Sequence, residues 1–496
     1  MIALRLRQCA LLALSFLICL VAFYQMFQRT EGAVPSSFAT KLAVWGVLSL
    51  VFWGVTVWRQ PYASQTIQPC VTLLTGVGAV EIARIDHETG GAVADRQMLF
   101  VYIAIVLCTV MVACMRDYRI LRRFSYVSMV VGLALLMCPM IPFLGQEVNG
   151  ARIWIRLPGL GQFQPGEFAK LFLAFFFAAY LFDHRDQLAV GGRKVLGLQL
   201  PRIKDLGPII IVWIASMGVL VMQHDLGTSL MFFAMFVAML YVATGRLSWI
   251  VIGFLAFAAG AVLAAGLFSH VGARVDAWLH PFDDDVYNRI GGSYQIVTGL
   301  FGLASGGLFG TGLGQGHPNL TPFGNSDYIY ASVGEEMGLM GCFGTLMLYV
   351  VIIASGFVTA MKVKDGFGKL LASGLVFTMA FQVFTVVGGI TLVIPLTGLT
   401  MPYMAAGGSS LIANYVLATL LVIVSNAANK PAPDVSSETF QMDALAVVAE
   451  RERERERETP RRASRGVHAA HGAHAVHAVP NTDDEATIAI EREEAR

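Results

Sequence analysis

The stretch GNSDYIYASVGEEMGLMGCFGTLMLYVVIIASGFV, residues 324–358, decides the fold. Its second part, from residue 338 onward, carries no charged side chain, and about 20 such helical residues cross the ~30 Å hydrocarbon core of a membrane. Its first part carries three acids, Asp327, Glu335 and Glu336, and no basic residue. Ionisable side chains at the ends of membrane helices are expensive to bury and are candidates for function. The stretch therefore predicts a membrane span with an acidic site at its mouth.

The same apolar pattern recurs along the whole chain. Of its 496 residues, 56% are hydrophobic and only 14% are charged, whereas soluble domains carry about 25% charged residues. The apolar runs are continuous, unlike the alternating strands of a membrane β-barrel. We therefore predict an all-α polytopic membrane protein with about 12 transmembrane helices. The predicted spans are 10–27, 41–58, 66–83, 98–115, 124–144, 166–182, 207–223, 227–244, 248–268, 338–358, 370–394 and 408–425.

Lysine and arginine are unevenly divided between the two sides of these spans. They are about twice as frequent on the side that holds both termini, which the positive-inside rule makes cytoplasmic. The connection at 269–337 then becomes a large extracytoplasmic loop. Its stretch GLFGLASGGLFGTGLGQG (299–316) is rich in glycine, which costs about 1 kcal/mol at each interior helical position. We expect a re-entrant or surface-lying element that lines a cavity, rather than a regular helix.

From residue 428 the chain becomes polar. It contains an ERERERERE run (450–458) and four histidines spaced three apart from residue 468 to 477. Such a composition cannot bury enough apolar surface to fold, so residues 428–496 are predicted to form a disordered cytoplasmic tail. The histidines could bind a metal on a helix, but a loose polar tract is favoured. The formal net charge of +1 argues against a nucleic-acid-binding surface.

Two groups of charged residues near the outer ends of the spans join the acids of the opening stretch as candidates. Glu167 and Lys170 are three residues apart and share one face of a helix. Lys170 could hold a pyrophosphate-bearing substrate, with Arg152 as a second cation; the alternative is an interfacial ion pair beside snorkelling arginines. Asp225, in QHDLGTSL, is either functional or simply a helix N-cap.

The three acids of the opening stretch differ in how well a purely structural role explains them. Helix capping and a solvated helix face account well for Glu336. They account less well for Asp327, because an aromatic run from Tyr328 to Tyr330 follows it. If the helix begins early, Glu335 and Glu336 lie about two turns beyond Asp327.

Two further motifs imitate known sites. GTGLGQG (310–316) resembles a phosphate-binding loop, but no strand precedes it and no Lys-Ser/Thr follows it, so we exclude that function. The acids Asp283, Asp284 and Asp285 contain the D-x-D arrangement that some metal-dependent enzymes use against a diphosphate. Adjacent acids in a loop are more often simply solvated, and we favour that interpretation.

Taken together, several segments resemble the SEDS family (shape, elongation, division and sporulation), which includes RodA and FtsW. The matching stretches occur in family order over residues 66–425: NGARIWI, FQPGEFAK, QHDLGTSL, GGSYQIVTGLFGLASGGLFGTGLGQG, SDYIYASVGEEMGLMG and IPLTGLTMPYMAAGGSSLIANY. The sequences IPLTG and LIANY are more similar to RodA than to FtsW. Two stretches depart from the family: AAGGSS (405–410) stands for SYGGSS, and VVG (386–388) for NIG.

The resemblance implies a peptidoglycan glycosyltransferase that polymerises lipid II at the outer face of the bacterial cytoplasmic membrane. It implies a class B penicillin-binding protein, a transpeptidase, as partner, together with other proteins of an elongation or division complex. It makes Asp327 the catalytic residue. The residues it assigns to substrate binding are Arg152, Trp154, Glu167, Lys170, Asp225 and Glu335.

The resemblance also divides the chain. The family core has ten spans, so residues 1–63 would be two additional helices, 64–427 the core and 428–496 the tail. In the core, Asp327 would act as a general base on a sugar hydroxyl, while Lys170 and Arg152 stabilise charge on the leaving pyrophosphate. The resemblance implies no definite cofactor, and the alternative is a divalent cation, Mg or Mn, that aids at the pyrophosphate. The alternatives are a lipid II flippase, which needs no base, and a structural scaffold, which leaves the intramembrane charges unexplained.

Overall fold

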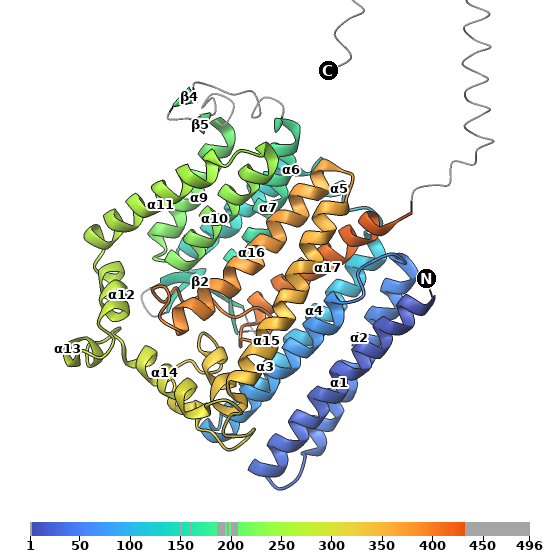
Figure 1. Cartoon of the computed structure of the whole chain (residues 1–496), viewed down its shortest axis with the longest axis vertical. Helices are drawn as coiled ribbons and strands as arrows, with labels where there is room; N and C mark the ends of the chain where they lie inside the picture. The colour runs from blue at the N-terminus through green and yellow to red at the C-terminus, as the bar shows by residue number, and fades with distance from the viewer. Residues whose placement is uncertain are drawn as a thin grey trace, which may run out of the picture. The chain divides into compact units, whose positions relative to one another are not determined.

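A computed structural model describes residues 2–148, 151–157, 161–185, 194–195, 198–199 and 207–431. Most of the predicted tail, including its charged run and its histidines, lies outside these residues. Within them, each of the predicted spans overlaps a helix (Figure 1), although α6 ends at Met137 and α16 at Ile390, before the predicted ends at 144 and 394. These helices are α1 (Ile2–Thr30), α2 (Ser36–Arg59), α3 (Ile67–Thr89), α4 (Val93–Cys114), α6 (Ser125–Met137), α7 (Gly166–Asp183), α9 (Gly207–Met222), α10 (Leu226–Thr244), α11 (Ser248–Leu267), α15 (Ile329–Lys362), α16 (Gly366–Ile390) and α17 (Gly408–Asn429).

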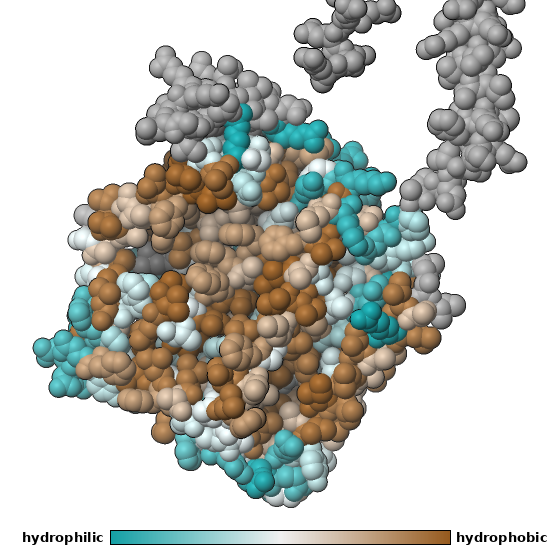
Figure 2. All heavy atoms as spheres, viewed as in Figure 1, coloured by the Kyte–Doolittle hydropathy of each residue, from teal (hydrophilic) through white to brown (hydrophobic). Residues whose placement is uncertain are grey.

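In the described part of the chain, eight of these helices are long and apolar enough to cross a membrane. The other four, α3, α6, α7 and α9, are shorter or carry more charged residues. Figure 2 shows a broad apolar surface across the middle of one face, with hydrophilic side chains toward its margins. This surface is suited to lipid rather than to water. The predicted all-α polytopic membrane fold is confirmed.

The bundle has a buried centre and a lipid-facing periphery. In the most apolar 18-residue stretch of each helix, 72% of the residues of α16 and 78% of those of α17 are buried, whereas only 11% of those of α11 are. A helix that is hydrophobic all round is either buried in a core or exposed to lipid. The two N-terminal helices lie against the core, α1 along α3 and α2 along α4.

A small antiparallel sheet connects α6 to α7. A 3₁₀ turn (Cys138–Met140) leads into β1 (Gly145–Val148), β2 (Ala151–Leu157) and β3 (Gly161–Phe163). Gln146 pairs with Trp154 and Arg156 pairs with Gln162. A shorter strand pair, β4 (Lys194–Val195) and β5 (Leu198–Gln199), follows α7.

The loop predicted at 269–337 is more helical than expected. It contains α12 (Ser269–Leu279), α13 (Asp284–Tyr287), α14 (Tyr294–Gly306) and a 3₁₀ turn (Pro318–Leu320). The expectation of a poor helix is therefore wrong for residues 299–306. The glycines of α14 allow close packing on α15: a Cβ at Gly306 would lie 2.0 Å from the Gly334 carbonyl oxygen, and one at Gly299 would lie 2.7 Å from the Tyr328 ring.

Helix α15 begins at residue 329, nine residues before the predicted span, and it is kinked at Gly338. That glycine has φ 66° and ψ −169°, outside the helical region. The glycine strap, residues 307–316, replaces the helical hydrogen bonds lost there. Leu339 and Met340 donate to the carbonyls of residues 307 and 308 at 2.9 and 3.1 Å, and Thr311 and Gly312 donate to those of residues 335 and 336 at 2.9 and 3.0 Å. The predicted start at 338 thus marks the kink rather than the helix end.

One end of the bundle gathers the segments that matter for the site. The N–H of Ala406 donates to the Asn325 carbonyl at 2.8 Å, and the N–H of Gln164 donates to the Ser409 hydroxyl at 3.1 Å. The Trp278 indole of α12 donates to the Leu392 carbonyl at 2.9 Å. The loop before α15, the sheet, α12 and the turn before α17 therefore meet at the same end.

Candidate functional site

Asp327 lies two residues before α15, at the end where these segments meet. The aromatic residue that follows it, Tyr328, is fully buried, and Asp327 itself is half-buried. Burial disfavours the charged form and raises the pKa of the Asp327 carboxyl to about 7, while the nearby Arg274 guanidinium opposes this shift. A carboxyl group that titrates near neutrality is suited to take up a proton as a general base.

Arg274 was not identified from the sequence. It projects from α12, is half-buried, and its Nη1 donates to the Thr397 carbonyl at 3.4 Å. Burial lowers the pKa of Arg274, whereas the carboxyl groups of Asp225 and Asp327 raise it. The guanidinium therefore acts electrostatically on both acids. Its position among the few basic residues of the outer loop is the signal that could have found it.

Asp225 caps α10, as its alternative interpretation stated. Its Oδ1 accepts the N–H of Thr228 at 3.0 Å. Burial raises the pKa of Asp225, and Glu167 adds to this shift while Arg274 opposes it. Capping does not exclude a role in the site, because Asp225 shares Arg274 with Asp327.

Glu167 and Lys170 form the expected ion pair, and it is buried. The Lys170 Nζ donates to Glu167 at 2.6 Å, to Gln382 Oε1 at 3.2 Å and to Asn414 Oδ1 at 3.3 Å. The Lys170 side chain is 1% exposed. Its partners come from α7, α16 and α17, so the ammonium holds three helices together and would contact a substrate only by giving up these partners.

Arg152 and Trp154 lie on β2, and among the described residues neither makes a hydrogen bond to Glu167 or Lys170. Arg152 is exposed and pairs with Glu147 of β1 at 3.3 Å. The expectation that Arg152 joins Lys170 as a second cation finds no contact among the described residues, because the sheet turns Arg152 toward its own hairpin. Trp154 is half-buried and lines an open cavity of about 540 Å³.

Glu335 and Glu336 are both buried, so the interpretation of Glu336 as a solvated residue is wrong. Glu336 accepts the Arg84 Nε at 3.0 Å and the N–H groups of Gly314 and Gly316 at 2.9 and 3.3 Å. Glu335 accepts the N–H of His317 at 2.6 Å. The loop GTGLGQG thus surrounds a carboxylate of its own chain. Arg84 also bonds the Gly316 carbonyl, at 2.8 Å, and so joins α3 to the glycine strap.

The other motifs are accounted for without a ligand. Asp283, Asp284 and Asp285 are exposed, and Asp283 caps α13 by accepting the N–H of Asp285. Among the described residues, no group of three or more His, Cys, Asp or Glu side chains is placed to hold a metal ion.

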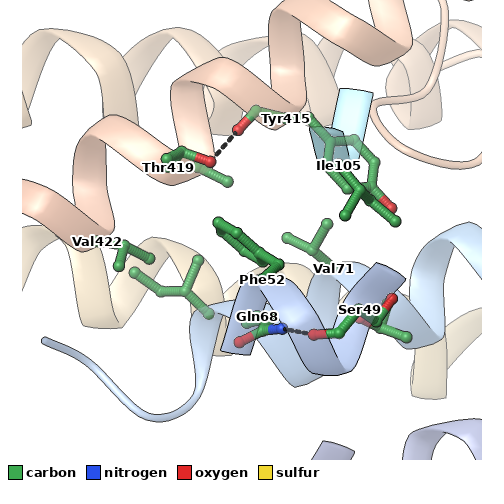
Figure 3. A pocket seen from close by; sticks show the side chains of 11 residues that line it. Ser49, Phe52, Gln68, Val71, Ile105, Tyr415, Thr419 and Val422 are labelled. Atoms are coloured by element: carbon green, nitrogen blue, oxygen red, sulfur yellow. Dashed lines mark hydrogen bonds between the residues drawn. The ribbon is translucent and has the colours of Figure 1, made fainter. Parts of the chain in front are cut away.

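A second, small cavity lies where α2 meets the core (Figure 3). Its volume is about 20 Å³, enough for one water molecule at most. Phe52 and Val71 line it together with two polar groups that are already bonded, since Gln68 donates to the Ser49 carbonyl and Thr419 to the Tyr415 carbonyl. This cavity is therefore too small to hold a substrate.

The fold and the site together define an integral membrane protein in which two acids, Asp225 and Asp327, lie near Arg274 at one end of the helical bundle. The chain matches, over residues 64–430, the model of the cell cycle protein family that groups FtsW, RodA and SpoVE, and it belongs to this family.

Its relatives specify the class further. Peptidoglycan glycosyltransferase RodA of Mycobacterium tuberculosis is 45% identical over 378 residues, which cover 75% of this chain and 80% of the relative. RodA of Mycobacterium leprae is 42% identical over 418 residues, covering 81% and 87%. A solved chain from a peptidoglycan synthase complex that coordinates polymerization and crosslinking has the same fold, with a TM-score of 0.60 at 24% identity over 74% of this chain and 99% of that chain. The chain is thus a peptidoglycan glycosyltransferase. The prediction from its C-terminal motifs that it is closer to RodA than to FtsW is confirmed.

Proposed function

We propose that this enzyme polymerises lipid II into glycan strands at the outer face of the bacterial cytoplasmic membrane, with Asp327 as its general base. One observation carries this assignment: Asp327 is half-buried at the mouth of the bundle, and its pKa of about 7 lets it accept a proton at physiological pH. The names of the relatives support the reaction class.

The reaction needs one proton transfer and one bond exchange. The Asp327 carboxylate takes the proton of the 4-hydroxyl of the acceptor sugar. The hydroxyl oxygen then forms a bond to the anomeric carbon of the donor sugar, and the bond from that carbon to undecaprenyl diphosphate breaks. The diphosphate leaves with the electron pair. Arg274 keeps part of the Asp327 population ionised, because its charge opposes the rise in the Asp327 pKa.

The remaining candidates have supporting roles in this proposal. Glu167 and Lys170 fix α7 against α16 and α17. Asp225 orients the start of α10 and shares the charge of Arg274. Glu335 holds the end of the glycine strap. No step in this mechanism passes through a metal ion.

The proposal extends to organisation and partners. Residues 64–427 form the catalytic core, residues 1–63 supply two additional helices, and residues 428–496 form a tail. Both termini lie in the cytoplasm, in agreement with the arginine and lysine distribution. A transpeptidase of the class B penicillin-binding type is the expected partner, which is supported by the similarity in fold to a chain of a synthase complex that couples polymerization to crosslinking.

Incubation of the purified protein in lipid nanodiscs with labelled lipid II tests the function. We expect glycan polymer and released undecaprenyl diphosphate. In proteoliposomes, translocation of intact lipid II without polymer would identify a flippase instead. If the folded protein forms no polymer and translocates no lipid II, the structural scaffold is the remaining function.

A further inference from the structure

Glu81 of α3 is a buried acid that takes no part in the proposed mechanism. It is 0% exposed, and within the described residues neither of its carboxyl oxygens has a hydrogen-bond partner. Burial of an isolated carboxylate costs far more than burial of a neutral carboxylic acid, so such a group takes up a proton instead. The structure therefore favours a neutral, protonated Glu81.

The charged groups around Glu81 add to this preference. Its electrostatic neighbours are Arg84 on its own helix and Glu335 and Glu336 of α15, and the buried Cys342 thiol also lies within its influence. The two acids of α15 and the one guanidinium already leave one negative charge, and ionisation of Glu81 would add a second. Like charges repel strongly in a low-dielectric interior. The cluster is thus closest to neutrality when Glu81 keeps its proton.

Glu81 differs from the two neighbouring acids because each of those has donors. Glu336 accepts the Arg84 Nε at 3.0 Å and two N–H groups of the glycine strap at 2.9 and 3.3 Å. Glu335 accepts the N–H of His317 at 2.6 Å. Hydrogen bonds of this kind stabilise a carboxylate. The proton of the cluster is therefore assigned to Glu81 rather than to either acid of α15.

Arg84 is the group for which Glu81 and the glycine strap compete. Its Nε bonds Glu336, and its Nη2 bonds Glu88 and the Gly316 carbonyl. Its Nη1 is buried and has no partner within the described residues. Glu81 precedes Arg84 by three residues on α3, so the two side chains share one face of the helix. An ionised Glu81 would attract the guanidinium through Nη1 and draw it away from Glu336.

We propose that Glu81 is a positioning residue that acts through its proton. In the neutral form it leaves Arg84 to Glu336 and the glycine strap, and on ionisation it competes for Arg84 and loosens the strap. The strap supports the first part of α15, directly after Asp327. A proton on Glu81 thus keeps the catalytic segment in place, a link that rests on the proposed function. Activity should therefore decline at alkaline pH, on the side opposite to the limb set by Asp327.

Infrared difference spectra of the full chain in lipid nanodiscs test the protonation state without turnover. At about pH 8 Asp327 is mostly ionised, because its pKa is about 7. The wild type should still show the carbonyl stretch of a protonated carboxylic acid, and Glu81→Gln should lose it. Glu31→Gln is the matched control, since the Glu31 side chain is 35% exposed and pairs with His87 at 3.3 Å. It should keep the band, whereas an unchanged band in Glu81→Gln would overturn the proposal.

The pH dependence of stability and activity tests the effect on the strap. The folded protein keeps a proton that the unfolded chain releases, so the Tm of the wild type should fall as the pH rises from about 6 to about 9. Glu81→Gln and Glu81→Met cannot ionise at this position. Their Tm should exceed that of the wild type by about 2 °C or more at the higher pH, and their polymerisation should lack the alkaline decline.

The outcomes separate this proposal from the proposed function. The same pH dependence of Tm and of polymerisation in the wild type and in both folded variants would overturn the role of Glu81. A wild-type protein that makes no polymer, but whose infrared band and Tm depend on Glu81 as described, would keep the proton site and refute the proposed function instead.

Discussion

At the level of single residues, the balance between burial and Arg274 sets the properties of Asp327. Burial raises the pKa of an acid because the carboxylate loses hydration, and a nearby cation lowers it again. Asp327 becomes a competent base only where it is ionised, so activity should rise with pH and level off above about 7.

Removal of Arg274 should displace this pH dependence. In Arg274→Gln the opposing charge is gone, so the pKa of Asp327 rises and the acidic limb of kcat/KM should move to higher pH. The pH profile of lipid II polymerisation measures this, with Arg289→Gln as the control. An unshifted limb would separate Arg274 from Asp327.

The Glu167–Lys170 pair should show the behaviour of buried ions. Lys170→Met leaves the buried Glu167 carboxylate without its cation, and loss of one partner of such a pair costs about 3–5 kcal/mol. The double variant Glu167→Gln/Lys170→Met removes both charges and should be more thermostable in detergent than Lys170→Met alone. A double variant that is strictly additive in its loss of stability would mean that the two charges do not depend on each other.

Single residues were predicted from the sequence where the relevant partner was near in the chain. The spacing of Glu167 and Lys170 predicted their contact, and the position of Asp225 before a span predicted its cap. Glu336 was misinterpreted because its partner Arg84 is 252 residues away. Arg274 was not identified, since nothing in the local sequence indicates which acids it faces.

At the level of elements, the kink of α15 and the glycine strap form one unit. The strap supplies main-chain donors and acceptors where Gly338 interrupts the helix, and Glu336 and Arg84 tie it to α3. This unit fixes the first part of α15, directly after Asp327. Glycine richness was the sequence signal, but it was interpreted as a lack of helix, whereas in α14 it permits close helix packing.

Gly310→Ala should disrupt this unit. Gly310 has φ +83°, and a Cβ there would lie 2.2 Å from the Glu336 carbonyl oxygen. We expect a lower Tm and strongly reduced polymerisation, because overpacking adds about 1–3 kcal/mol to the left-handed strain of about 1–2 kcal/mol. Gly291→Ala is the control, since Gly291 has φ +74° with open space around it and carries the strain alone. Equal effects of the two substitutions would show that the strap contact is unimportant.

At the level of the whole molecule, the sequence was most informative about the membrane spans. Continuous apolar runs predicted a helix at every span, because a hydrocarbon environment requires each backbone polar group to bond within its own segment. The arrangement of these helices around α16 and α17 was not predictable, since it depends on which faces are buried rather than on mean hydropathy.

The tail should be dispensable for chemistry. Its composition predicts that it does not fold, and the proposed topology puts it on the side of the membrane opposite to Asp327. A chain that ends after residue 431 should polymerise lipid II in detergent at a rate within about twofold of the full chain, because no proposed catalytic group is removed. A truncated protein that is folded but inactive would refute this separation.

The central claim is that Asp327 removes the proton from the acceptor hydroxyl, and the polymerisation rate of Asp327→Asn measures it most directly. Asparagine keeps the shape of the side chain but cannot accept the proton, so the rate should fall by about 100-fold or more, while binding of undecaprenyl diphosphate and the Tm stay near those of the wild type. Asp285→Asn, in the exposed part of the same outer loop, should retain full activity. Glycan polymer formed at near wild-type rate by a well-folded Asp327→Asn protein would contradict the account.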